Sequence, residues 1–383
     1  MPVVVRRAIV SDIDAILELL TEYDLPRTYF EPYYYRDPTY RPEHSWLVVV
    51  DGRLAAHLRI FDRCIYVHGV TLHVAGIGNV ITGRAFRGGG FAGRLLRAVT
   101  REAPADGFVY SLLWTHLPAL YNRYGWVAID QEAIHASLNA VAQQYSVAEF
   151  TADDLPDVMR LYESTNQVRS GPTVRSADYW RAQLTWTRED LDGFLLTRDS
   201  GGSLTGYIRS RRAPAAVEIL ELGAVPGEVE YGRELAETVA SRRAGQIEAQ
   251  LPPSLYDVVA GNHRQVVPAS GLMGRVLDVT GLLTTLEPVL VRRAQASGRA
   301  GCSLSLATSA GASHVVVGND RLTVDTRPFA DARAPLGEGD LAHLLFHGFD
   351  AAAATRLEHR GDADILRSLF PAQDFIIWPA DAF

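Results

Sequence analysis

The stretch that most constrains this chain of 383 residues is the segment 78–93, GNVITGRAFRGGGFAG. An apolar run typical of a strand leads into three consecutive glycines, and apolar residues at helical spacing follow them. Glycine lets a backbone approach a ligand closely, and the first turn of a helix carries unpaired N–H groups and a partial positive charge. With three arginines nearby, Arg84, Arg87 and Arg94, the segment predicts an anion site, most often for phosphate. An ordinary surface turn is the alternative.

The length of the chain favours two or three domains. Hydrophobic residues make up 47% and charged residues 21%, which is typical of globular proteins. Apolar runs fall short of the roughly 18 residues of a membrane helix. The apolar run at the N-terminus is also too short for a secretory signal. We therefore expect a cytoplasmic protein that does not engage a membrane.

The net charge of −8 disfavours nucleic acid as a partner and favours cationic small molecules. The two cysteines, Cys64 and Cys302, have no paired spacing, which argues against a disulfide framework. The 11 histidines include no His-Glu-x-x-His pattern. We expect no metal site.

Periodicity in the first third of the chain predicts the order β-α-β-β-β-α-β-α-β. Asp51-Gly52 is a strong hairpin signal. Hairpins alternate with helical crossovers, so the sheet should be mixed. The expected strands are 3–7, 45–50, 54–60, 70–81, 108–114 and 126–138, with a further strand-like run at 64–67. The first helix should end near Asp24.

The segment LPRTYFEPYYYRDPTYRPEHS, residues 25–45, is dense in aromatic, proline and acidic residues. Its prolines predict a long loop rather than a long regular element. Such a loop could hold an amine by stacking, cation–π attraction and carboxylate contacts. Alternatively, its tyrosines could cover the domain core or a subunit interface.

From about residue 147 the pattern partly repeats, with a helix at 154–162, strands between 193 and 225, and a helix at 231–243. Where the first copy has RGGGFAG, the second has PGEVEYG, which includes Glu228 and Glu230. Carboxylates at a helix start would repel a pyrophosphate. We expect the second copy to be non-catalytic.

A third domain is expected from about Gly271, with a helix at 277–286, strands at 302–307 and 315–324, and a helix at 340–346. The run FIIW at 375–378 is too apolar for a frayed end and should pack onto the protein. The expected domains are therefore 1–140, 141–270 and 271–383.

The glycine segment fits two patterns. Gly88-x-Gly90-x-x-Gly93 satisfies the dinucleotide fingerprint, which would make the chain an NAD(P)-dependent oxidoreductase. That fingerprint needs a strand ending just before its first glycine and an acidic residue about 20 positions later. Here five residues intervene after the strand, and Asp106 comes early.

Arg87-x-x-Gly90-x-Ala92 fits the second pattern better. It resembles the Arg/Gln-x-x-Gly-x-Gly/Ala loop with which the GNAT superfamily of acetyltransferases grips the pyrophosphate of acetyl-coenzyme A. The following LLWTHLPALYNRYGW is similar to that family's strand and helix near the acetyl group.

Within the superfamily, the chain resembles the enhanced-intracellular-survival (Eis-like) family of bacterial acetyltransferases. The shared features are a second, degenerate GNAT unit, a third domain similar to sterol carrier protein, and a chain that stops on Phe383. The resemblance implies an α/β fold of two tandem GNAT-type mixed-sheet units followed by a sterol-carrier-protein-like α+β domain. It also implies a homo-oligomer, trimer or hexamer.

The resemblance assigns roles in binding acetyl-coenzyme A, the co-substrate. The pantetheine arm would pair with the backbone of Val80, Ile81 and Thr82, and Thr115 would lie on the cofactor side near the acetyl group. The pyrophosphate would be held by Arg87, Gly88, Gly90, Ala92 and Gly93.

The resemblance also implies a mechanism, in which Tyr121 is the general acid and the terminal carboxylate of Phe383 is the general base. The acceptor would be a primary amine of a polyamine-like, aminoglycoside-like or lysine-containing substrate. Its candidate contacts are Asp24, Phe30, Glu31, Asp37, His116 and Asp381.

The chain departs from the family in two places. The family often has an acid where this chain has Ala382, and it usually has a small-acidic pair in place of Thr115-His116. A non-catalytic carrier that senses coenzyme A and binds an apolar ligand is a further alternative.

Overall fold

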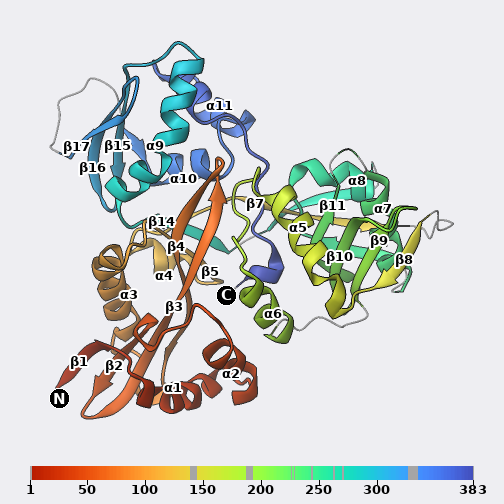
Figure 1. Ribbon diagram of the computed structural model, residues 1–383. Helices are drawn as coiled ribbons and strands as arrows, with labels where there is room; N and C mark the ends of the chain where they lie inside the picture. The colour runs from red at the N-terminus through yellow and green to blue at the C-terminus, as the bar shows by residue number, and fades with distance from the viewer. Residues whose placement is uncertain are drawn as a thin grey trace.

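The computed structural model of the chain contains, in its described residues, two sheets of seven strands and one of four (Figure 1). The described residues are 2–138, 145–186, 193–225, 227, 229–242, 245–261, 264–269, 271–326 and 335–382. The predicted fold class is confirmed, since two large mixed sheets are followed by a smaller part of strands and helices.

The first sheet has the order β1-β2-β3-β4-β5-β14-β6. Neighbours from β1 to β4 are antiparallel, whereas β4 and β5 are parallel. Its strands are β1 (Val3–Arg7), β2 (Ser45–Val50), β3 (Arg53–Val67), β4 (Val70–Thr82), β5 (Tyr110–Trp114), β14 (Leu272–Val276) and β6 (Val127–Ala128). The accompanying helices are α1 (Ile13–Leu20), α2 (Arg27–Tyr35), α3 (Phe91–Glu102) and α4 (Pro118–Asn122).

The predicted hairpin between β2 and β3 is confirmed. Asp51 and Gly52 have φ of 48° and 77°, the two positive values that a tight hairpin turn requires. β3 continues without a break to Val67, so the separately predicted strands 54–60 and 64–67 form one long strand.

The prediction of a long loop at 25–45 is wrong for its first half, because Arg27–Tyr35 is the helix α2. Pro32 lies inside this helix and removes one backbone donor. Phe30 and Tyr34 are buried against α1 and β2, and this packing offsets the lost hydrogen bond.

The predicted single strand 126–138 is also wrong. Its first residues form β6 in the first sheet, and the rest form β7 (Gln131–Ser137) in the second sheet. In return, β14 comes from the far end of the second unit and lies between β5 and β6. The two units therefore exchange strands, and sheet membership does not follow the expected divisions at residues 140 and 270. A local pattern cannot reveal which sheet a strand joins.

The second sheet has the order β13-β7-β12-β11-β10-β9-β8, and its strands are arranged similarly to those of the first sheet. β11 and β12 are its parallel pair, as β4 and β5 are in the first sheet. Its strands are β7, β8 (Ser146–Glu149), β9 (Phe194–Arg198), β10 (Leu204–Arg212), β11 (Val217–Ala224), β12 (Gln246–Ala249) and β13 (Arg264–Ala269). Its helices are α5 (Leu155–Asn166), α6 (Ala177–Trp186), α7 (Val229–Ser241) and α8 (Tyr256–Ala260).

The third part packs on the upper end of the long β3–β4 hairpin (Figure 1). Ile65 and Leu72 of that hairpin share one hydrophobic cluster with Leu282 and Leu286 of α9. The third part has the sheet order β17-β16-β15-β18. Its elements are α9 (Val279–Ala296), β15 (Cys302–Thr308), β16 (Gly311–Val317), β17 (Leu322–Asp325), β18 (Leu336–Gly337), α10 (Glu338–Phe346), α11 (Ala351–Leu357) and α12 (Ala363–Leu369).

The segment after α12 returns to the junction of the two large units (Figure 1). All four residues of the 375–378 run are buried, which confirms that this run packs onto the protein. Ile376 N donates to Ser170 O at 3.1 Å, and Trp378 Nε1 donates to Asn166 Oδ1 at 2.9 Å. The end of the described chain is thereby fixed to the second unit.

Candidate active site

The site begins with a bulge in β4. Arg59 pairs with Gly78 and His57 pairs with Ile81, so β4 carries one more residue than β3 between these pairs. Asn79 lies in this bulge with φ of 52°, which is unusual for a residue other than glycine. His57 Nδ1 lies 3.0 Å from Asn79 O, and Asn79 Nδ2 donates to Tyr34 Oη at 3.3 Å. These contacts hold the bulged backbone from behind.

The bulge lies where β4 and β5 separate. Their parallel pairing runs from Val74–Tyr110 to Ile77–Leu113, directly before the bulge. Beyond it, residues 80–82 pair only with β3 among the described strands. Val80 O accepts from Tyr23 Oη at 2.7 Å and Thr82 O from Arg87 Nε at 3.4 Å. The remaining backbone groups on the β5 side can pair with a ligand, because this side of the strand has no neighbouring strand.

The glycine turn closes one end of this opening. Gly88 and Gly90 have φ of 82° and 70°, and a Cβ at either position would meet nothing within 4 Å. Gly90 is the N-cap of α3, whose first internal hydrogen bond runs from Arg94 N to Gly90 O. The earlier amides of that turn have no helical acceptor. Arg87 and Arg94 are exposed beside them, so the turn can bind an anion.

Gly93 and Tyr124 pack tightly in the first turn of α3. A Cβ on Gly93 would overlap the Tyr124 hydroxyl. Ala92 lies half-buried beside Gly93. This contact ties the helix that carries the glycine turn to the loop that follows α4.

Tyr121 lies in α4 and is 8% exposed. Burial raises the pKa of Tyr121, so its hydroxyl is protonated at neutral pH. Its neighbour Tyr23 donates to Val80 O at 2.7 Å. Burial, and then the proximity of Tyr121, raises the pKa of Tyr23. Tyr121 belongs to the hydrophobic cluster against which Val80 of β4 packs, although the two residues are about 40 positions apart in sequence.

This arrangement matches a known domain family. Residues 4–129 match the family described as acetyltransferase (GNAT) domain. The chain carries a GNAT acetyltransferase domain. It is therefore an acyltransferase.

Solved structures extend the likeness of the fold to the whole chain. A GCN5-related N-acetyltransferase from Anabaena variabilis has a TM-score of 0.75 at 15% sequence identity. A GCN5-related N-acetyltransferase from Kribbella flavida has a TM-score of 0.72 at 18% sequence identity. Eis1 from Mycobacterium abscessus has a TM-score of 0.67 at 13% sequence identity. Each comparison covers 100% of both chains. No curated protein matches the sequence significantly.

Outside the acetyltransferase opening, the predicted substrate contacts lie in different surroundings. Asp24 is exposed and pairs with Arg84 at 2.8 Å, and Glu31 pairs with Arg27 at 2.8 Å. Phe30 is buried within the core of the first unit. Solvent competes with both surface ion pairs, so the two carboxylates can exchange partners at little cost.

Asp37 is different, because its side chain is fully buried. It binds Arg59 at 2.6 Å and Arg63 at 2.9 Å. Burial opposes ionisation of Asp37, but Arg63 and Arg59 together lower its pKa. Both arginines occupy this buried carboxylate, so it is not available to a mobile ligand, and removing it would leave two buried charges without their partner.

Asp381 is also fully buried, within the second unit. It accepts hydrogen bonds from Arg175 at 2.8 Å, Gln183 at 2.8 Å and Tyr179 at 3.2 Å. Arg175 in turn pairs with Glu221. This network anchors the chain two residues before its end.

Arg63 links the two networks, since its guanidinium lies 4.8 Å from the Tyr179 ring centre. Tyr33 of α2 also packs against Trp186 of α6, with ring centres 5.6 Å apart. The tyrosine-rich segment therefore serves partly as core and partly as an interface between units. The core role was one of the open interpretations of that segment. The contact between units lies within one chain and does not test the predicted subunit interface.

The remaining predicted residues lie after β5, in α7 or outside the described residues. Thr115 N donates to Gly271 O at 2.9 Å, and His116 is exposed next to it. Phe383, the expected general base, lies outside the described residues, as do Pro226 and Glu228. Glu230 is described in the first turn of α7, where it accepts from Tyr145 Oη at 2.9 Å.

Within the described residues, no group of three or more His, Cys, Asp and Glu side chains is placed to hold a metal ion. In the same residues, no helix combines the length and apolar character needed to cross a membrane.

Sequence reasoning missed three functional features of this site. The Gly-Asn pair within an apolar strand could have indicated the bulge at Asn79. Tyr23 and Arg175 carry no local signal, because their partners are about 57 and 206 residues away.

Proposed function

We propose that the chain is an N-acetyltransferase that moves acetyl from acetyl-coenzyme A to a primary amine. The acceptor would be a small cationic molecule, polyamine-like or aminoglycoside-like, or a lysine-containing peptide. One observation carries the proposal. The opening between β4 and β5 leaves residues 80–82 without a strand partner on the β5 side among the described strands. It has the glycine turn at one end, and Tyr121 belongs to the hydrophobic cluster against which Val80 packs.

The residues present fit the coenzyme. A pyrophosphate needs a concave surface of backbone amides with no Cβ in the way, which Gly88 and Gly90 supply. Arg87 and Arg94 add positive charge nearby. The β5-facing edge of residues 80–82 can pair with the amides of a pantetheine arm. When bound, acetyl-coenzyme A supplies the acetyl thioester that is the acyl donor.

Tyr121 suits the role of general acid. Its raised pKa keeps the hydroxyl protonated at neutral pH, so the hydroxyl can donate a proton to a leaving thiolate. The hydrogen bond from Tyr23 to Val80 O fixes the neighbouring backbone against which the acyl donor would lie. A positioned acid of this kind contributes about 10²- to 10⁴-fold to a rate.

A general base is needed, because an amine attacks an acyl group only after losing a proton. We assign this role to the terminal carboxylate of Phe383. The Asp381 network supports the assignment, since it fixes the chain two residues earlier. The proposal keeps Thr115 as a cofactor contact and Asp24, Glu31 and His116 as candidate substrate contacts. It omits Asp37 and Asp381, because arginines occupy both, and Phe30, because its side chain is buried in the core.

The nicotinamide alternative has no support in the fold or in the family match. The homo-oligomeric state, the cytoplasmic location and the sterol-carrier-like character of the third part stay predictions.

The test is an amine panel assayed with acetyl-coenzyme A and scored by thiol release. Tyr121→Phe should lower kcat by about 10²-fold or more with coenzyme affinity unchanged. One residue added after Phe383 should do the same. Tyr35→Phe, at an exposed tyrosine of α2, is the matched control and should keep full activity. Coenzyme binding without acetylation of any amine would instead support the carrier alternative.

A further inference from the structure

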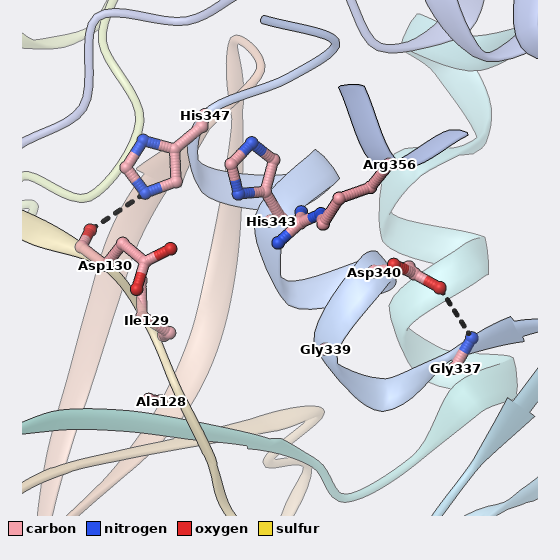
Figure 2. Close-up of a pocket in the computed structure, with 9 residues that line it drawn as sticks. All are labelled: Ala128, Ile129, Asp130, Gly337, Gly339, Asp340, His343, His347 and Arg356. Carbon is pink, nitrogen blue, oxygen red and sulfur yellow. Dashed lines mark hydrogen bonds between the residues drawn. The ribbon is translucent and has the colours of Figure 1, made fainter. Parts of the chain in front are cut away.

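A second cavity lies where the first unit, the second unit and the third part meet. Its volume is about 870 Å³, the size of a small-molecule site. It extends from Thr115 and His116, after β5, to His343 and His347 on α10. A smaller lobe of about 320 Å³ adjoins it and shares both histidines (Figure 2).

The walls of the larger cavity are mainly apolar and come from all three parts. Leu272 and Met273 belong to β14, Leu251 to the second unit, and Phe375 and Ile376 to the returning segment. All five side chains are buried. A ligand in this cavity must therefore have an apolar body.

The acidic groups lining the larger cavity accept hydrogen bonds. Asp130 has no side-chain partner among the described residues, and Figure 2 shows its carboxylate directed into the smaller lobe. Glu132 accepts one bond, from Tyr256 Oη at 3.2 Å. Asp350 accepts from Ala353 N at 2.8 Å. Burial opposes ionisation of Asp350, but that bond and His343 lower its pKa.

The two histidines at the end of the cavity also present acceptors. His347 Nε2 must carry its proton, because it donates to Asp130 O at 2.9 Å. Burial lowers the pKa of His347 to about 4, so the ring is neutral and its Nδ1 is a lone-pair acceptor. His343 is 7% exposed and donates from Nε2 to Asp350 Oδ1 at 2.7 Å. Its Nδ1 has no partner in the described part of the chain.

The lining is therefore rich in acceptors and negative charge. Among the described residues of the larger cavity there is no arginine, and Arg356 lines only the smaller lobe. A ligand that satisfies these groups must bring N–H donors and positive charge together with an apolar body.

We propose that this junction cavity is a binding site for an amine with an apolar body, distinct from the coenzyme opening between β4 and β5. Val80, the glycine turn and Tyr121 do not line the cavity, whereas Thr115 and His116, kept above as candidate contacts, do. The cavity therefore adjoins the proposed acetyl-transfer site and extends beyond it. Thr115 and His116 place one end of the cavity next to the end of β5. Because three parts of the chain form the walls, the ligand also joins them together.

The test is calorimetric titration of the full chain with 4-phenylbutylamine and with 4-phenylbutanol, which share an apolar body. Coenzyme A is present throughout to fill the coenzyme half of the acetyl-transfer site without allowing turnover, and the variants at the cavity wall separate binding there from binding in the acceptor half. We expect the amine to bind at least tenfold more tightly than the alcohol. The double variant Asp130→Asn, Glu132→Gln should remove most of that difference.

Asp153→Asn changes an exposed carboxylate away from the cavity and is the matched control. Ala352→Trp adds bulk at the wall and should weaken the binding of both probes. Equal affinity of amine and alcohol would overturn the proposal, as would unchanged amine binding in the double variant or competition between the amine and coenzyme A. None of these results depends on acetyl transfer, so they are distinct from a failure of the proposed function.

Discussion

The absence of a side chain at Gly93 determines how closely α3 approaches the loop after α4. A Cβ there would overlap the Tyr124 hydroxyl, and Gly93 is buried, so the half-buried Tyr124 side chain would have to be displaced. The family resemblance assigned Gly93 to the pyrophosphate. The structure adds a packing reason that comes from a residue 31 positions later.

Gly93→Ala should therefore destabilise the first unit by about 1–3 kcal/mol, the usual cost of overpacking. Thermal unfolding of the variant and the unchanged protein measures this loss of stability. Tyr124→Phe removes the closest atom and should recover part of the loss in the double variant, which would show that the pair is coupled. Gly339→Ala in α10 meets nothing within 4 Å and should leave stability unchanged or slightly raised. A neutral Gly93→Ala would contradict the close contact.

At the scale of elements, the bulge in β4 separates a sheet into a paired half and an open half. Asn79 keeps its φ of 52° because His57 and Tyr34 hold its carbonyl and amide groups. A β-branched residue adopts this conformation at a cost of roughly 1–2 kcal/mol. Flattening the strand would relieve that cost and bring β4 back toward β5.

Asn79→Val should accordingly weaken coenzyme A binding by about tenfold, the equivalent of 1.4 kcal/mol. Asn79→Gly accepts the same φ and should bind within about threefold of the unchanged protein. Calorimetric titration of coenzyme A measures both. Equal binding by the valine variant would show that the bulge does not shape the site.

Local elements were predictable wherever a pattern was complete within a few residues. The Asp51-Gly52 turn, the glycine turn before α3 and the buried 375–378 run are examples. The helix α2 was not predicted, because Pro32 argues against a helix until the burial of Phe30 is known. Tyr121 was found only through a family resemblance, since a lone tyrosine has no distinctive local pattern.

For the whole molecule, two buried histidines, His57 and His68, and the half-buried His347 make stability depend on pH. Burial lowers the pKa of His57 to about 3 and those of His68 and His347 to about 4. His68 and His347 also join parts, through Leu344 O at 2.7 Å and Asp130 O at 2.9 Å. In the unfolded chain these groups bind protons near pH 6.5.

The unfolded state therefore binds more protons than the folded state below about pH 6.5, and stability falls as the pH drops toward 4. Each histidine contributes up to about 1.4 kcal/mol per pH unit in that window. Urea unfolding at about pH 7.5, 6 and 5, values on both sides of the ordinary histidine pKa of about 6.5, measures how the free energy of unfolding changes with pH. His347→Gln keeps a donor for Asp130 O and should reduce the slope. Constant stability between about pH 7 and 5 would contradict this account.

The exchange of β7 and β14 also sets the order in which the protein can fold during synthesis. β5 ends at Trp114, but the strand that pairs with its outer edge ends only at Val276. At ribosomal rates of about 5–20 residues per second, the first sheet waits roughly 8–30 s for its partner. During that time β5 exposes an unpaired edge, the kind of surface that chaperones shield and that aggregation uses.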